Sequence, residues 1–279
     1  MIELLEKDIM ETNNKSSKGN QLKWRADDYW YKSDFAGYEG LSEVIVSKML
    51  HNSTLKEDEY VCYEPEQIKY KTTVFNGCKA KNFLKTKGQQ LITLERLYSN
   101  FYGESLYRTL FHIHDEKERF SFLVNQVERI TGIKQFAVYL NKIVTIDALT
   151  LNEDRHMHNI AVVMNADGEY DLCPIFDQGA GLLSDTTLDY PIGADVYKLI
   201  DSVKAKTFSS SFDEQLEISE AFAGNSIKFT FTKSDVRQWL ANDQLRKMYS
   251  EKILERVEKV VVDRMRKYQY LFLDGGTVQ

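Results

Sequence analysis

A polar loop and the short segment that follows it hold the residues whose types and spacing could do chemistry. Asp154 and Asn159 lie five positions apart, and Asp177 follows a little later. A carboxylate can orient the proton of an attacking hydroxyl, while an amide oxygen and a second carboxylate can hold magnesium on nucleotide phosphates. Magnesium keeps several waters, so one Asn and one Asp suffice as protein ligands. The pattern predicts an ATP- and Mg²⁺-dependent phosphotransferase, with Asp154 as catalytic base and Asn159 and Asp177 as metal ligands.

The predicted elements around this loop would bring the three residues together. Residues 160–164 and 170–175 are predicted strands, and the Asp-Gly pair between them is a strong hairpin-turn signal. The hairpin begins directly after Asn159 and ends just before Asp177. All three polar residues are therefore expected at one mouth of the fold.

The first part of the chain is predicted to be a small, strand-rich lobe. Its apolar and turn residues indicate a hairpin, one helix and two further strands. These elements are expected at residues 21–25 and 29–32 for the hairpin, 38–50 for the helix, and 60–63 and 71–75 for the strands.

The second part is predicted to be mostly helical. Helical apolar stripes occupy residues 116–130, 133–149 and 244–271. Residues 82–90 are polar and lysine-bearing and mark the boundary, which divides the chain into an N-lobe, 1–84, and a C-lobe, 85–279. We expect an α+β, two-lobed protein-kinase-like fold, because the motif order is that of the kinase signature set.

The match to conventional protein kinases is incomplete. Asn152 replaces the histidine that normally precedes the catalytic Asp by two positions, and the metal motif is Asp177-Gln-Gly179. Neither G-x-G-x-x-G nor V-A-I-K occurs in the first lobe. The chain is therefore not expected to be a conventional eukaryotic-type protein kinase.

These departures follow another pattern. The motif Asn152-x-Asp154-x-His156-x-x-Asn159, followed by Phe176-Asp177, resembles the HipA-like serine/threonine kinases of bacteria. Residues 16–21, 30–32 and 37–41 look like the first lobe of the compact members of that group. The resemblance extends from about residue 15 to the C-terminal helix, and the catalytic loop with Asp177 is its most specific part.

The resemblance implies roles for residues of the first lobe. Lys32 would contact the nucleotide phosphates and would be steadied by a helix glutamate. Glu39 and Glu43 both qualify, because they are four residues apart on one side of the predicted helix. The position directly after Tyr38 slightly favours Glu39.

The segment before the first hairpin is the expected phosphate loop. Its only glycine is Gly19, so backbone amides would cap phosphates if Ser17, Lys18 and Asn20 permit close approach. Some members of the resembled family autophosphorylate serines here, which makes Ser16 and Ser17 candidates. A phosphate would add about −1.5 to −2 charges and could repel nucleotide or remodel the loop.

Composition narrows the classes of partner. The net charge of −6 and pI near 5.5 argue against direct nucleic-acid binding, and no apolar run approaches the length of a membrane span. Three separated cysteines without a CxxC pair, and no signal-peptide pattern, favour the cytoplasm. The expected partner is a protein substrate with Ser or Thr, and the resemblance adds an antitoxin-type partner.

Two pairs of histidines, as zinc ligands, and one hydroxyl-rich segment are weaker candidates for functional sites than the catalytic loop. His112 with His114, and His156 with His158, have the alternation of strand ligands for zinc. The first pair lacks nearby acids at a ligand spacing, and the resemblance already accounts for His156 as part of the loop structure. Residues 181–202 occupy the position of an activation loop and contain Ser, Thr and Tyr hydroxyls. We expect at most peptide binding or regulation there.

Two other functions stay open. The catalytic and metal segments also resemble those of phosphoinositide kinases, and small-molecule kinases share the same spacing logic. Residues 178–197 contain no Lys or Arg, which disfavours an inositol-phosphate headgroup. A pseudokinase-type binding module would bind nucleotide without transferring phosphate.

Overall fold

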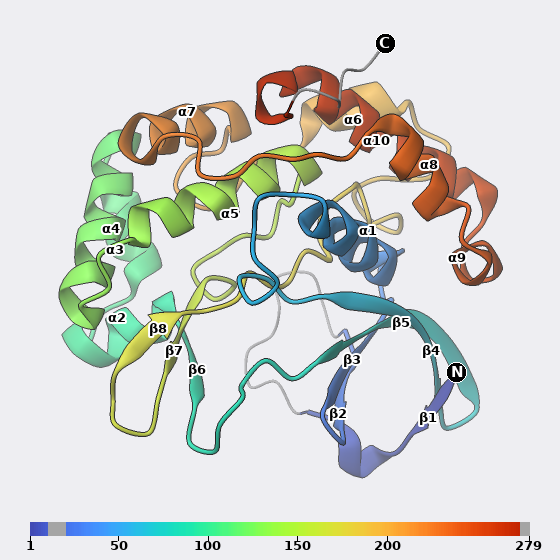
Figure 1. The fold of residues 1–279 in the computed structure, drawn as a ribbon, viewed down its shortest axis with the longest axis horizontal. Helices are drawn as coiled ribbons and strands as arrows, with labels where there is room; N and C mark the ends of the chain where they lie inside the picture. Colours follow the sequence, from blue (N-terminus) through green and yellow to red (C-terminus); the bar gives the residue numbers. More distant parts are fainter. Residues whose placement is uncertain (11–20, 274–279) are drawn as a thin grey trace.

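The computed structural model describes residues 1–10 and 21–273. Its N-terminal part is a curled five-stranded sheet with one long helix against it, as Figure 1 shows. The strand order is β1-β4-β5-β3-β2, and β1 pairs with β4 in parallel while the other neighbours are antiparallel. The elements are β1 (Ile2–Leu4), β2 (Lys23–Ala26), β3 (Tyr29–Ser33), α1 (Glu39–His51), β4 (Tyr63–Tyr70) and β5 (Thr73–Lys81).

Most of the predicted N-terminal elements are confirmed, with shifted bounds. The predicted hairpin is β2 and β3, and the predicted helix is α1. Residues 60–63 lead into β4 rather than forming a strand of their own, and Tyr60 instead makes an isolated parallel bridge with Ile175. The three-residue strand β1 was not predicted, because it carries too few residues for an alternation pattern.

The C-terminal part is mostly helical, with one three-stranded sheet of order β6-β7-β8. The predicted hairpin of residues 160–175 is confirmed as β7 and β8, and the unpredicted β6 pairs with β7. In the N-terminal part, the short 3-10 helix η1 (Glu6–Asp8) lies between β1 and β2. The remaining elements are β6 (Gln90–Thr93), α2 (Leu94–Tyr102), α3 (Leu106–His112), α4 (Glu116–Thr131), α5 (Phe136–Thr150), β7 (Ala161–Met164), β8 (Tyr170–Leu172), α6 (Val196–Ser202), α7 (Phe212–Ala223) and α8 (Lys233–Leu240).

The C-terminal stripe of residues 244–271 is not one helix. It is divided into α9 (Asp243–Met248), α10 (Glu251–Lys267) and a short 3-10 turn, η2 (Gln269–Leu271). Tyr249 is extended, and its hydroxyl donates to Asp34 in the N-terminal part at 2.9 Å. This contact between the two parts of the molecule ends α9 where the apolar spacing alone would continue it.

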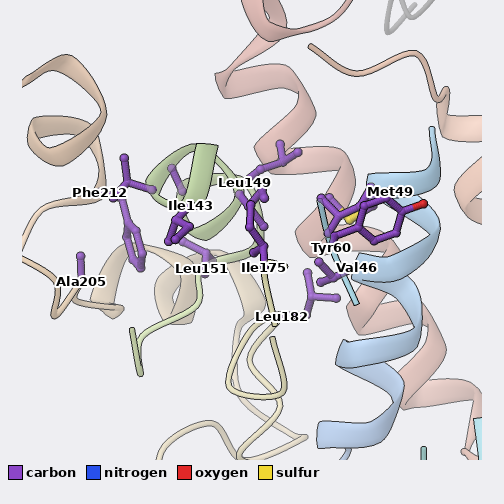
Figure 2. Close-up of a cluster of buried hydrophobic side chains, with 14 of the residues drawn as sticks. Val46, Met49, Tyr60, Ile143, Leu149, Leu151, Ile175, Leu182, Ala205 and Phe212 are labelled. Atoms are coloured by element: carbon purple, nitrogen blue, oxygen red, sulfur yellow. The ribbon is translucent and has the colours of Figure 1, made fainter. Parts of the chain in front are cut away.

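One large hydrophobic core joins α1 to the C-terminal helices. Figure 2 shows Val46 and Met49 of α1 in the same cluster as Ile143 and Leu149 of α5. A separate small cluster lies in the N-terminal sheet and consists of Leu4, Trp24, Tyr31 and Ile68. Helix α1 is therefore packed between the sheet and the helical part. The lobe border between residues 84 and 85 stays a prediction.

Within residues 1–10 and 21–273, no helix has the length and apolarity needed to cross a lipid bilayer.

Candidate active site

Two glycines allow close packing of helix α1 on β5 and of β5 on β3. A Cβ atom on Gly40 would lie 2.6 Å from the backbone of Gly77 on β5, and a Cβ atom on Gly77 would lie 2.1 Å from the carbonyl oxygen of Lys32. Real Cβ atoms do not come so close to backbone atoms, so a larger residue at Gly40 would push α1 away from β5, and a larger residue at Gly77 would push β5 away from β3. The close approach brings the side chain of Glu43, on α1, within reach of Lys32, on β3.

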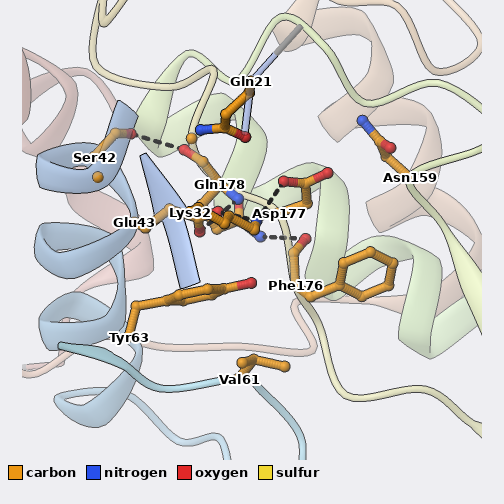
Figure 3. A network of polar contacts seen from close by, with 12 residues as sticks. Gln21, Lys32, Ser42, Glu43, Val61, Tyr63, Asn159, Phe176, Asp177 and Gln178 are labelled. Atoms are coloured by element: carbon orange, nitrogen blue, oxygen red, sulfur yellow. Dashed lines mark hydrogen bonds and ion pairs between the residues drawn. The ribbon is translucent and has the colours of Figure 1, made fainter. Parts of the chain in front are cut away.

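Lys32 joins two carboxylates from different parts of the chain. Its Nζ atom lies 2.6 Å from Glu43 Oε1 and 2.7 Å from Asp177 Oδ1. Figure 3 shows Lys32 between these two side chains. The exposed fractions of the three side chains are 11% for Lys32, 1% for Glu43 and 22% for Asp177. Lys32 Nζ also lies 4.9 Å from the centre of the Tyr63 ring, a cation–π contact. The predicted phosphate-binding lysine and metal-binding aspartate are thus in direct contact.

Glu43, rather than Glu39, is the partner of Lys32, so the slight preference for Glu39 was wrong. The Glu39 carboxylate accepts hydrogen bonds from the backbone N–H groups of Phe35, Ala36 and Gly37. It caps the turn that leads into α1, where a negative charge is favourable. Spacing alone could not separate the two glutamates, because the choice depends on the direction in which the chain enters the helix.

In this cluster, burial and the attraction between opposite charges act in opposite directions. Burial opposes the charged form of Lys32, but the carboxylates of Asp177 and Glu43 raise its pKa well above its usual value. Burial also acts against ionised Asp177, yet the charges of Lys32 and Lys23 hold its pKa far below its usual range. For Glu43, burial outweighs the charge of Lys32 and raises the pKa of the carboxyl group. Asp177 is therefore anionic and suited to hold a cation.

The backbone around Asp177 is fixed to helix α1. Asp177 has a φ of 63°, in the left-handed region that Asp tolerates better than most residues. The next backbone N–H, of Gln178, donates to Glu43 Oε2 at 2.8 Å, and the Gln178 carbonyl accepts from Ser42 Oγ at 2.7 Å. Helix α1 thus holds both the lysine partner and the turn that directs the Asp177 carboxylate.

A buried arginine ties the catalytic loop to the Asp177 segment. Arg155 is 1% exposed and pairs with Asp147 of α5 at 3.1 Å. Its Nη1 atom donates to the carbonyls of Asn159, at 3.0 Å, and Phe176, at 2.7 Å. Asn152 adds a hydrogen bond from Nδ2 to the Asp177 carbonyl at 3.4 Å. The loop and the metal segment are therefore held together, as the sequence predicted.

Asp154 lies beside two side chains that can carry positive charge. Its Oδ1 atom is 3.8 Å from His156 Nε2 and 3.9 Å from Lys206 Nζ. The backbone N–H of His158 donates to His156 Nδ1, which leaves the proton of the neutral ring on Nε2, facing Asp154. Burial lowers the pKa of His156 and so favours the neutral ring, while the charge of Asp154 acts in the opposite direction.

The side chain of Asn159 is oriented by a hydrogen bond to the backbone of Asp154. Its Nδ2 atom donates to the Asp154 carbonyl at 2.8 Å, so Oδ1 is the amide atom that can bind a cation. Figure 3 draws Asn159 on the side of Asp177 that faces away from Glu43. One amide oxygen and one carboxylate fit Mg²⁺, which prefers hard oxygen ligands and retains water. No group of three or more His, Cys, Asp or Glu that could hold a metal gathers in the described parts of the chain.

Three residues near the site were not predicted from the sequence. Lys23 on β2 is the register partner of Lys32, so both side chains lie on the same face of the sheet. Arg155 and Lys206 are the other two residues that were not predicted. The alternation of β2 could have indicated Lys23, but no local signal places Lys206 beside Asp154.

The predicted phosphate loop lies outside the described residues. Ser16, Ser17, Lys18, Gly19 and Asn20 therefore stay candidates on sequence grounds alone.

The activation-loop-like segment is anchored on both sides of the site. Tyr190 OH donates to Glu153 Oε2 at 2.7 Å, and its carbonyl accepts from Arg256 Nη1 at 2.6 Å. Thr187 Oγ1 donates to the carbonyl of Ala36, in the turn before α1, at 2.7 Å. The segment therefore contacts both the catalytic loop and the N-terminal part.

The comparisons with known proteins agree with this arrangement at the level of the fold. The sequence matches no protein-family model and no curated protein. The structure is similar to the crystal structure of a proinflammatory kinase from Helicobacter pylori, CtkA, with a TM-score of 0.63 and 14% identity over 95% of both chains. The likeness to this kinase confirms the predicted kinase-like fold. This chain has a two-lobed, α+β, kinase-like fold.

Proposed function

We propose that this chain is an ATP- and Mg²⁺-dependent kinase that transfers the γ-phosphoryl group of ATP to serine or threonine hydroxyls of proteins, including its own. The observation that carries the proposal is the contact of Lys32 with Asp177, together with the Arg155 bridge between the Asn159 and Phe176 carbonyls. These contacts unite a phosphate-binding cation, a metal-binding carboxylate and the catalytic loop.

Each residue of the site has a separate role in the proposed phosphoryl transfer. The acceptor hydroxyl oxygen forms a bond to the γ-phosphorus, and the bond to the β,γ-bridging oxygen breaks and leaves its electron pair on ADP. Asp154 accepts the hydroxyl proton. Lys32, held between Glu43 and Asp177, places positive charge against the nucleotide phosphates.

Asn159 Oδ1 and the Asp177 carboxylate are the atoms that would hold magnesium. When bound, the metal supplies charge neutralisation on the phosphate oxygens. The Glu43 contact to the Gln178 N–H keeps the Asp177 carboxylate in position for that role.

Radiolabelled phosphate transfer tests the proposal. The wild type is incubated with γ-labelled ATP and magnesium, alone and with a generic protein, a phosphoinositide or a small alcohol, beside an Asp154→Asn variant. We expect label on protein Ser or Thr that the variant loses. Transfer only to the lipid or the alcohol would show that the substrate is not a protein. ATP binding without any transfer would indicate a pseudokinase-type binding module.

Intact-mass analysis of the same reactions tests autophosphorylation. We expect added phosphate that maps to Ser16 or Ser17 and disappears in a Ser16→Ala/Ser17→Ala variant. Added phosphate that is unchanged in this variant would exclude these two serines.

A further inference from the structure

Lys206 is a candidate for a role in the transfer step that neither the motifs nor the fold assigns to it. Its ammonium lies 3.9 Å from Asp154 Oδ1, and its side chain is 44% exposed. It comes from the loop between α6 and α7, far along the chain from the catalytic loop. The position beside Asp154 therefore results from the tertiary fold.

The backbone on both sides of Lys206 is fixed. The N–H of Ala205 donates to the Ser210 carbonyl at 3.0 Å, and Thr207 Oγ1 donates to the carbonyl of Arg155, in the catalytic loop, at 3.0 Å. Ala205 and Thr207 are 5% and 1% exposed. The loop thus holds the Lys206 backbone next to the catalytic loop while its side chain extends toward Asp154.

Stability does not explain this placement. A partly exposed ion pair contributes little to stability, and the distance of 3.9 Å exceeds that of a hydrogen bond. The hydrogen bonds that anchor the loop come from Ala205 and Thr207 and do not involve the Lys206 side chain. A charged side chain next to the catalytic carboxylate is more useful for the reaction than for folding.

Two other cations of the site are held in ion pairs with carboxylates other than Asp154. The guanidinium of Arg155 is buried against Asp147, and Lys32 contacts Glu43 and Asp177. His156, the other basic group beside Asp154, uses Nδ1 to accept a hydrogen bond from the His158 N–H, and its Nε2 atom faces Asp154 at 3.8 Å. Negative charge is spread over the three equatorial oxygens of the phosphoryl group during transfer, and positioned cations stabilise it.

We propose that Lys206 contacts the transferred γ-phosphoryl group and stabilises the charge that it carries in the transition state. The inference rests on the proposed kinase function. Lys206 makes no bond to phosphorus; its ammonium donates a hydrogen bond to an equatorial oxygen while the acceptor oxygen bonds to phosphorus and ADP leaves. The flexible lysine stem can move the ammonium from Asp154 to that oxygen.

A transition-state analogue separates this role from ordinary nucleotide binding. Calorimetric affinities are measured for ADP with magnesium, without and with aluminium fluoride, in the wild type and in Lys206→Met. The wild type should bind the aluminium fluoride complex more tightly than ADP alone. Lys206→Met should lose at least about tenfold of that preference and keep its affinity for ADP, because only the planar phosphoryl mimic meets the ammonium.

Steady-state kinetics gives the matching readout. In Lys206→Met we expect kcat to fall by about 10²-fold with an unchanged KM for ATP, and in Lys206→Arg we expect partial recovery. Lys204, exposed in the same loop, provides the control, and Lys204→Met should behave as the wild type.

Each other outcome has a defined meaning. If the wild type transfers phosphate and Lys206→Met keeps both its turnover and its analogue preference, the inference is wrong while the kinase function stands. A raised KM for the protein substrate with unchanged kcat would assign Lys206 to substrate recognition instead. A wild type that neither transfers phosphate nor prefers the analogue would remove the proposed function, and the inference with it.

Discussion

On the Lys32 side of the site the charged groups touch at 2.6 and 2.7 Å, whereas on the Asp154 side they stand 3.8 and 3.9 Å apart. The first set is mostly buried and joins three elements, and the second lies partly at the surface. Buried pairs in direct contact fix geometry, and removing one member leaves an uncompensated charge. Groups beyond hydrogen-bond distance are not locked to one another and can form short contacts with reacting atoms. In the proposed kinase, the Lys32 side would bind the nucleotide and the Asp154 side would carry out the transfer step.

The largest effect on stability is expected when the cation on the buried side of the site is removed. Lys32→Met leaves Glu43 and Asp177 facing each other without their shared cation, and we expect the free energy of unfolding to fall by about 3–5 kcal/mol. Lys69→Met is the matched control, because Lys69 pairs with Glu3 at 3.1 Å on the exposed surface. Urea unfolding should show a loss below about 1 kcal/mol for the control. Equal losses in the two variants would contradict the distinction.

A smaller effect is expected from pH, through the residue that anchors α1. Asp34 Oδ1 accepts from the Gly40 N–H at 2.6 Å, and its Oδ2 accepts from Tyr249. Burial raises the pKa of Asp34 from 3.8 to about 7. A raised folded-state pKa means that the stabilising contribution is complete below about pH 4 and is lost as the pH rises through about 7.

The free energy of unfolding, measured from pH 4 to pH 8, checks this expectation. Relative to Asp34→Asn, the wild type should lose about 1–3 kcal/mol across that range. Parallel pH profiles for the two proteins would show that Asp34 ionises normally in the fold.

The smallest expected effect concerns a second lysine on the binding side. Lys23 lies beside Lys32 on the sheet, and its charge helps to lower the pKa of Asp177. Lys23→Met should weaken ATP binding by about 3–10-fold, since one partly solvated cation near the phosphates contributes about 1 kcal/mol. Lys81→Met, on the exposed end of β5, should leave the dissociation constant unchanged. Equal weakening in both variants would show a non-specific charge effect.

The sequence predicted the local parts of this site well. The Asp-Gly turn predicted the β7–β8 hairpin, and the hairpin predicted that Asp177 returns to the catalytic loop. These inferences succeed because the spacing between the residues is short and the connecting element is regular.

What the sequence could not predict depends on contacts between distant segments. Glu43 was not separated from Glu39, because helical spacing places both on one side and the capping of residues 35–37 decides between them. Lys206 was missed because a separate loop carries it to Asp154. The absence of Lys and Arg in residues 178–197 is therefore a weaker argument against an anionic acceptor than it appeared from the sequence alone.

The most direct test of a two-sided kinase site measures ATP binding and phosphate transfer together in two variants. Calorimetry with Mg²⁺ and ATP, and turnover on a protein substrate, are recorded for Asp177→Asn and Asp154→Asn. We predict that Asp177→Asn loses magnesium-dependent ATP binding and turnover, while Asp154→Asn keeps the wild-type affinity and loses about 10²–10⁴-fold in turnover. Magnesium-dependent binding that survives in Asp177→Asn, or turnover that survives in Asp154→Asn, would contradict the account.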